Sequence, residues 1–117
     1  MKRHIGMIGE ELAANHIKNE GYSILERNYR TKLGELDIIA RDQNIIIFIE
    51  VKTRTSDAYG MPSEAVNYKK QQTIRKLSQQ YIKHKKLDTG CFSYRFDVIE
   101  VRLVGKRYKI DHMENAF

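Results

Sequence analysis

The sequence has few of the residues that build disulfide or zinc frameworks. It carries one cysteine, Cys91, so a disulfide within the chain is excluded, and this composition fits a reducing cytosol. Four histidines are scattered without the short spacing of ligand pairs, which argues against a zinc site. They are His4, His16, His84 and His112.

Long hydrophobic runs are also missing. The longest, 45–49, is far too short to cross a bilayer, and there is no internal repeat or low-complexity segment. The basic start at Met1 to His4 precedes a polar helical pattern rather than an apolar signal segment. We therefore expect one globular domain over residues 1–117, located in the cytoplasm and without a membrane partner.

Acidic residues are outnumbered, with 15 Asp and Glu against 21 Lys and Arg, which gives a net charge of +6. A basic balance favours a polyanionic partner such as nucleic acid, although it also serves general solubility. Part of the positive charge lies around the centre of the chain, at Arg27, Arg30, Lys32 and Arg54. A second group lies at 69–86, where a solvated helix face is the better explanation for most of its members.

Hydrophobic periodicity predicts an α/β domain with helices flanking one sheet. Helices are expected at about 6–20 and 63–85, and strands at about 22–29, 35–41, 45–53, 92–101 and 108–110. Residues 56–60 should form a polar loop, and 61–64 should begin the second helix because Pro62 and Glu64 suit a first turn. The tail from residue 111 is expected to cap the core through Phe117.

The first predicted helix carries an apolar stripe, and Gly21 suits a left-handed cap at its end. Glu10 borders this stripe, so it is either a rim residue or an acid that points toward the sheet. The second helix has one irregular position, Lys70, four residues from both Val66 and Ile74. Lys70 either packs its stem and extends its ammonium to water, or holds its charge against an anionic cleft. The stripe of the first helix consists of Ile5, Ile8, Leu12, Ala13 and Ile17.

The central segment predicts a hairpin that turns at Asp42 to Asn44. Strand alternation places Glu50 and Lys52 on one face, together with Ile46 and Phe48. Asp37 then falls opposite Ile49 or Glu50, depending on register. Like charges that face each other on a sheet repel, so the carboxylates either splay into water or are neutralised by a cation.

Our hypothesis is the second of these. Asp37 and Glu50 are the candidate ligands of Mg²⁺ (or Mn²⁺), and the backbone carbonyl of Val51 is a third. Lys52 leaves the strand on the same face as Glu50, where it can orient the attacking water and counter the transition-state charge. Taken alone, a Glu-x-Lys pair on a strand is more commonly a surface ion pair.

Two segments carry a family resemblance. The stretches at 34–40 (GELDIIA) and 48–54 (FIEVKTR) resemble the core motif of the restriction-endonuclease-like, PD-(D/E)-x-K, superfamily. Within it the chain is similar to the bacterial YraN family, also at 9–10, 21–22, 27–28, 64–66, 70 and 95–98. The Asp37-to-Glu50 spacing and the helical Glu10 are similar to archaeal Holliday-junction resolvases. One departure is Leu36, where the superfamily has proline.

This resemblance implies a restriction-endonuclease-like αβββαβ core with a mixed sheet flanked by helices. It implies Asp37 and Glu50 as metal ligands, Lys52 as the catalytic lysine and Glu10 as an accessory acid. The expected activity is a Mg²⁺-dependent endonuclease acting on DNA rather than RNA, including branched or damaged DNA.

Two other functions are compatible with the same residues. One is a nucleic-acid-binding module that does not cut, and the other is a structural adaptor with a vestigial cluster. The complete Asp–Glu–Lys set argues against the adaptor. In either nucleic-acid function, Arg30, Arg54 and Lys70 are expected nearest the phosphates, and an enzyme that cuts two strands would most simply be a symmetric homodimer.

Overall fold

The computed structural model describes residues 2–55 and 66–117, and its elements confirm the predicted α/β class. The polar loop and helix start predicted at 56–65 lie outside the described residues. Among the described residues, no helix is both long enough and apolar enough to span a membrane. The elements are α1 (Lys2–Asn19), β1 (Ser23–Thr31), β2 (Gly34–Asp42), β3 (Ile45–Thr55), α2 (Tyr68–His84), β4 (Ser93–Val104) and β5 (Arg107–Met113).

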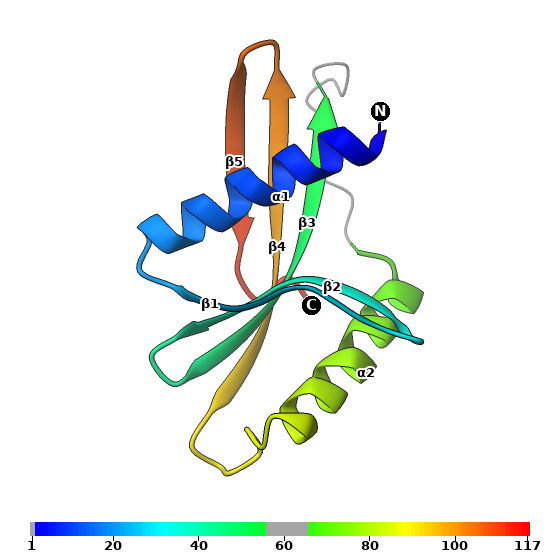
Figure 1. The fold of residues 1–117 in the computed structure, drawn as a ribbon, viewed down its shortest axis with the longest axis vertical. Helices are drawn as coiled ribbons and strands as arrows, with labels where there is room; N and C mark the ends of the chain where they lie inside the picture. Colours follow the sequence, from blue (N-terminus) through cyan, green and yellow to red (C-terminus); the bar gives the residue numbers. More distant parts are fainter. Residues whose placement is uncertain (1, 56–65) are drawn as a thin grey trace.

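The strands form one mixed sheet in the order β1-β2-β3-β4-β5. β3 and β4 are parallel, while the other three neighbouring pairs are antiparallel. Parallel neighbours need a crossover connection, and the segment containing α2 supplies it. The order is therefore an αβββαβ core followed by β5, compatible with the nuclease-like fold expected from the motifs (Figure 1).

β3 is apolar on both faces because a helix packs against each face of the sheet. Ile47 and Ile49 belong to the core that includes Ala13 and Ile17 of α1. Ile46 and Phe48 belong to the core that α2 completes. This confirms the predicted alternation along β3, and it places Glu50 and Lys52 on the α2 side.

α1 approaches β3 so closely that only glycine fits at position 9. A Cβ added to Gly9 would overlap Thr53 Oγ1 and lie 2.9 Å from Thr53 Cβ. Because of this contact, the buried stripe of α1 is centred on Gly9, Ala13 and Ile17. The prediction that Ile8 belongs to the stripe is wrong, since Ile8 is 38% exposed. The next residue after Gly9 is Glu10, so the close approach also fixes where this acid enters the fold.

α2 begins later than predicted. Asn67 is its N-cap, with an extended backbone and a side chain that accepts a hydrogen bond from Lys70 N at 2.8 Å. Val66 and Asn67 precede the helix, which corrects the expected start at residue 63 for these two positions. Within the helix, Ile74 and Leu77 are buried under the sheet.

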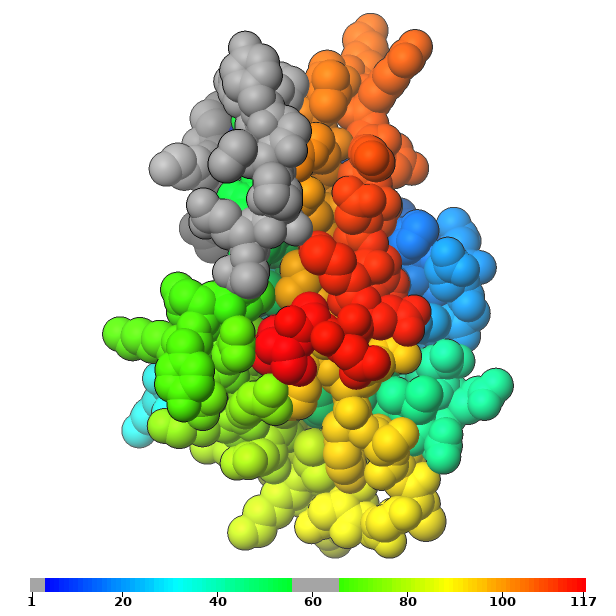
Figure 2. Space-filling view, turned by 180° about the vertical axis from the view of Figure 1, so that it is seen from behind, coloured from blue at the N-terminus to red at the C-terminus, as the bar shows by residue number. Residues whose placement is uncertain are grey.

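The C-terminal segment also differs from the prediction, because β5 continues to Met113 instead of ending at 110. Beyond it, Ala116 N donates to Phe96 O at 2.8 Å and Phe117 stacks on the Phe96 ring, with centroids 5.3 Å apart. The prediction that Phe117 caps the core is confirmed. Figure 2 shows these last residues, in red, lying beside α2 on this face of the molecule.

Candidate functional site

The β1–β2 hairpin changes face at Asn28 and Asp37, which lie opposite each other between paired residues of the two strands. Toward the tip, Tyr29 and Leu36 pack in the core under α2, whereas Ile38 packs in the core under α1. In a regular strand Leu36 and Ile38 would share a face. Asn28 has a left-handed backbone, with φ of 54°, which few residue types adopt readily. The hairpin therefore twists at the position of Asp37.

β2 and β3 separate at the same level, so that a fork opens between them. Their ladder runs from Asp42–Ile45 to Ile38–Ile49, which brings Asp37 level with Glu50. Past the end of the ladder, Asp37 Oδ2 accepts a hydrogen bond from Val51 N at 2.8 Å. The side chain of Asp37 thus satisfies a strand amide inside the fork and is held next to Glu50.

The carboxyl groups of Asp37 and Glu50 are hydrogen-bonded to each other. Burial, followed by the charge and the hydrogen bond of Asp37, raises the pKa of Glu50 to about 8. Burial also raises the pKa of Asp37, against the hydrogen bond from Val51 N. At neutral pH the pair therefore retains one proton, because two like charges cannot both be ionised there without compensation.

Two lysines border this pair. Lys70 Nζ on α2 lies 3.7 Å from Glu50 Oε2, and its charge lowers the pKa of Glu50, as does that of Lys52. The Lys70 side chain is 42% exposed, while that of Glu50 is 15% exposed. Of the two readings of Lys70, the structure supports a cation held against an anionic cleft, with its ammonium still reachable by solvent.

Glu10 reaches the same region from α1. Burial raises its pKa, followed by the charges of Asp37 and Glu35, while Arg27 lowers it. The Asn28 carboxamide lies between two carboxylates, so its nitrogen is assigned to the side that faces them. It then donates to Glu10 Oε1 and Glu35 Oε1, each at 2.9 Å. Glu10 is therefore an acid that points toward the sheet, and not only a rim residue.

Asn28 and Glu35 were not identified from the sequence. The signal for Glu35 was its place two residues before Asp37 on the same strand. The signal for Asn28 was the register of the β1–β2 hairpin, which places Asn28 opposite Asp37.

The two arginines proposed as phosphate contacts are already ion-paired. Arg30 Nη2 lies 2.7 Å from Glu35 Oε2 with its side chain 74% exposed, whereas Arg54 Nε lies 3.6 Å from Oε2 of the buried Glu100. They line separate hollows of about 570 and 450 Å³ that share Glu10. The structure thus brings Lys70 to the carboxylates and places Arg30 and Arg54 on either side of Glu10.

The donor atoms in the fork suit a hard cation. Among the described residues, no group of three or more His, Cys, Asp or Glu side chains could hold a metal ion. Mg²⁺ requires only one or two carboxylates, because it keeps several waters. Val51 N points at Asp37, and the N–H and C=O of one strand residue point to the same side, so the Val51 carbonyl also faces the fork. Asp37, Glu50 and this carbonyl fit such an ion.

Comparison with known proteins places the chain in a family. Residues 9–101 match the family described as "Uncharacterised protein family UPF0102". A UPF0102 protein of Alkaliphilus oremlandii (strain OhILAs) is 60% identical over 117 residues, covering 100% of both chains. UPF0102 proteins of Clostridium botulinum strains 657 and Loch Maree are 56% and 53% identical, covering 98% of this chain and 94% of theirs. The chain therefore belongs to the UPF0102 family, which is the YraN family that its motifs resemble.

Proposed function

We propose that this protein is a Mg²⁺- or Mn²⁺-dependent endonuclease that hydrolyses phosphodiester bonds in DNA, including branched or damaged DNA. The observation that carries the proposal is the hydrogen-bonded pair of Asp37 and Glu50, held in the fork with Lys70 beside it. Such a pair costs stability unless a cation occupies it. A fold that nevertheless builds the pair has a site suited to a divalent metal.

The chemistry divides among the residues by position. A divalent cation bound there would stabilise charge at the phosphate and lower the pKa of a bound water. Asp37 and Glu50 hold it, together with the Val51 carbonyl. Lys52, on the same face as Glu50, orients the attacking water and counters the charge of the transition state. Glu10 adds a further negative charge at the edge of the site, where it helps to hold the cation.

Binding of the nucleic acid would rest on the basic side chains around the fork. Lys70 is nearest the carboxylates, and Arg30 and Arg54 must exchange Glu35 and Glu100 for phosphates. Affinity should therefore fall as salt rises, because each neutralised phosphate releases counterions. A symmetric dimer that cuts two strands, and a cytosolic location suggested by the single free cysteine, complete the proposal.

The test is a cleavage assay on linear, flapped and four-way DNA, with a matched RNA, in Mg²⁺ or Mn²⁺. Wild-type protein should cut at least one form. Asp37→Asn and Lys52→Ala should reduce the rate at least about 100-fold, the size of effect seen when a group acting on the transition state is removed. Glu20→Gln, an acid at the exposed end of α1, is the control and should cut normally.

Binding measured in parallel separates cutting from recognition. Calorimetric titration with Mn²⁺ should show weaker metal binding for Asp37→Asn, while Lys52→Ala retains part of it. DNA binding should persist in Asp37→Asn, since less negative charge faces the phosphates. Wild-type protein that binds DNA yet cuts none of the substrates would instead be a nucleic-acid-binding module. Equal cutting by Asp37→Asn would show that the active site lies elsewhere.

A further inference from the structure

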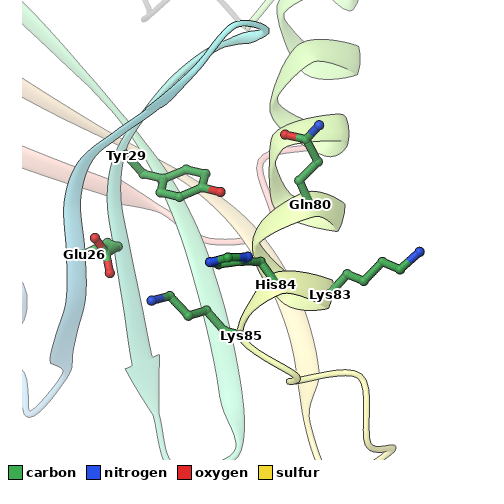
Figure 3. A pocket seen from close by; sticks show the side chains of 6 residues that line it. All are labelled: Glu26, Tyr29, Gln80, Lys83, His84 and Lys85. Atoms are coloured by element: carbon green, nitrogen blue, oxygen red, sulfur yellow. The ribbon is translucent and has the colours of Figure 1, made fainter.

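We infer that the hollow between β1 and the last turn of α2 binds a nucleotide unit, with its base on Tyr29 and its phosphate near His84 and Lys85. The hollow measures about 500 Å³, large enough to hold a small ligand. Figure 3 shows it opening between the strand and the helix. Its lining comprises Glu26, Tyr29, Gln80, Lys83, His84 and Lys85.

The charges around this hollow suit an anion. His84 and Lys85 point across it toward β1, while the Lys83 side chain points away from the strand (Figure 3). Among the ion pairs of the described residues, none involves Lys83, His84 or Lys85, so their donors are available to a ligand. Glu26 is the one acid in the lining. By contrast, the hollow beside Glu10 includes three acids against two arginines, so its balance of charge favours a phosphate less.

Tyr29 provides a fixed aromatic surface at the inner wall. Its ring packs edge-on against Tyr81, with centroids 5.2 Å apart, and Tyr81 in turn contacts Phe48 edge-on at 6.2 Å. Because Tyr81 and Phe48 are buried, the orientation of the Tyr29 ring is set before any ligand arrives. Aromatic rings stack on every base, so such a wall recognises a nucleotide without strong base preference.

This hollow is separate from the carboxylates in the fork. Lys70, which meets Glu50, and Lys85 are 15 positions apart along α2, a distance of about 22 Å at the helical rise. Occupation of the hollow therefore needs neither the metal nor the reaction proposed above. The ligand chemistry is the same whether the nucleotide is free or is one unit of a nucleic-acid strand.

The test follows binding by NMR with ¹⁵N-labelled protein and needs no catalysis. The probes are adenosine 5′-monophosphate, adenosine, inorganic phosphate and a 5′-phosphorylated oligodeoxyadenylate. The monophosphate should bind more tightly than adenosine or phosphate alone, and the largest shifts should fall on Tyr29, His84 and Lys85. Binding of both phosphorylated nucleotides would mean that a free nucleotide suffices, whereas binding of the oligonucleotide alone would assign the hollow to a strand.

Variants test the two halves of the hollow. Lys85→Gln should weaken monophosphate binding about fivefold or more, as expected for loss of one charge-assisted contact. Lys18→Gln, in the last turn of the other helix, is the matched control. Tyr29→Phe should retain binding, and Tyr29→Leu should lose about tenfold. Failure of both phosphorylated probes to bind, equal binding by Lys85→Gln and wild type, or shifts located elsewhere would overturn the inference.

Discussion

Asp97 on β4 and the Asp37–Glu50 pair are acidic groups that the same sheet removes from water, and their surroundings differ in kind. Asp97 is fully buried, and each of its oxygens meets donors from the protein. The carboxyl groups of Asp37 and Glu50 face each other instead. Glu50 and Asp97 lie on neighbouring strands, because Ile49 is in register with Asp97 and Glu50 is in register with Val98.

The Asp97 network is charge-balanced and closed. Arg95 forms a two-pronged contact with Asp97, both distances being 2.9 Å, and donates to Tyr22 OH as well. His112 Nε2 lies 2.7 Å from Asp97 Oδ2, and Asn115 N donates to Oδ1 at 3.1 Å. Burial raises the pKa of Asp97, but the hydrogen bonds from His112, Arg95 and Asn115 outweigh it, so the pKa lies below its ordinary value.

The two regions therefore differ in the hydrogen-bond donors that the protein supplies to the carboxyl groups, and not in burial alone. Asp97 ties β4 to β5 and to the C-terminal segment, its partner Arg95 reaches Tyr22, and no oxygen of Asp97 is left to accept from a ligand. In the fork, the protein supplies Val51 N and two lysines but leaves the two carboxyl groups sharing a proton. The first arrangement stabilises the fold, and the second has room for a cation from outside.

The largest expected effect comes from breaking the closed network. Asp97→Asn keeps the size of the side chain but removes the buried counter-charge of the Arg95 guanidinium, which is 12% exposed, and leaves it only the 57% exposed Glu114 at 3.5 Å. Uncompensated buried charge is costly, so the free energy of unfolding should fall by about 3 kcal/mol. Urea denaturation measures it, and Glu20→Gln at the surface is the control. An unchanged midpoint would mean that the network does not stabilise the fold.

The contrast between these regions was only partly predictable from the sequence. The period-2 pattern of β3 was enough to place Glu50 and Lys52 on one face, because both faces of this strand are covered. The left-handed backbone of Asn28 was not predictable, since no turn residue flanks it. For Lys70 the sequence left two readings open and could not choose between them, because its partner Glu50 lies 20 residues away and meets it only in the fold.

Two details of the prediction differ from the structure. The stripe of α1 was misjudged at Ile8 because the contact between Gly9 and Thr53 turns the helix. The start of α2 was placed at residue 63 because Pro62 and Glu64 are typical of a first turn, but the cap is Asn67. In both cases tertiary contacts or a competing cap outweighed a valid local signal.

A smaller expected effect is the pH dependence of the free energy of unfolding, to which Glu50 and Asp97 contribute with opposite sign. The pKa of Glu50 is raised from 4.5 to about 8, so the folded protein holds a proton that the unfolded chain releases between these values. Its stabilising contribution is fully present below pH 4.5 and is lost as pH rises toward 8. The contribution of Asp97, whose pKa is lowered, has the opposite sign and is lost only in acid below its ordinary pKa of 3.8.

Metal-free protein should therefore unfold at lower urea concentration at pH 8 than at pH 6, with a slope of at most about 1.4 kcal/mol per pH unit. Glu50→Gln should flatten this slope, and Mn²⁺ should restore stability at pH 8 in wild type but not in the variant. A slope that is unchanged in Glu50→Gln would assign the titration to another group.

The smallest expected effect separates the two basic partners, Lys70 and Arg95. Lys70→Gln removes a partly exposed ion pair with a 3.7 Å separation, so the free energy of unfolding should change by less than about 1 kcal/mol. Arg95→Gln should cost several times more because Asp97 stays buried. The informative readout for Lys70→Gln is a ¹³C titration of the carboxyl groups. Loss of a nearby cation disfavours the charged form, so the pKa of Glu50 should rise further. An unchanged Glu50 titration would mean that the Lys70 ammonium does not act on the pair in solution.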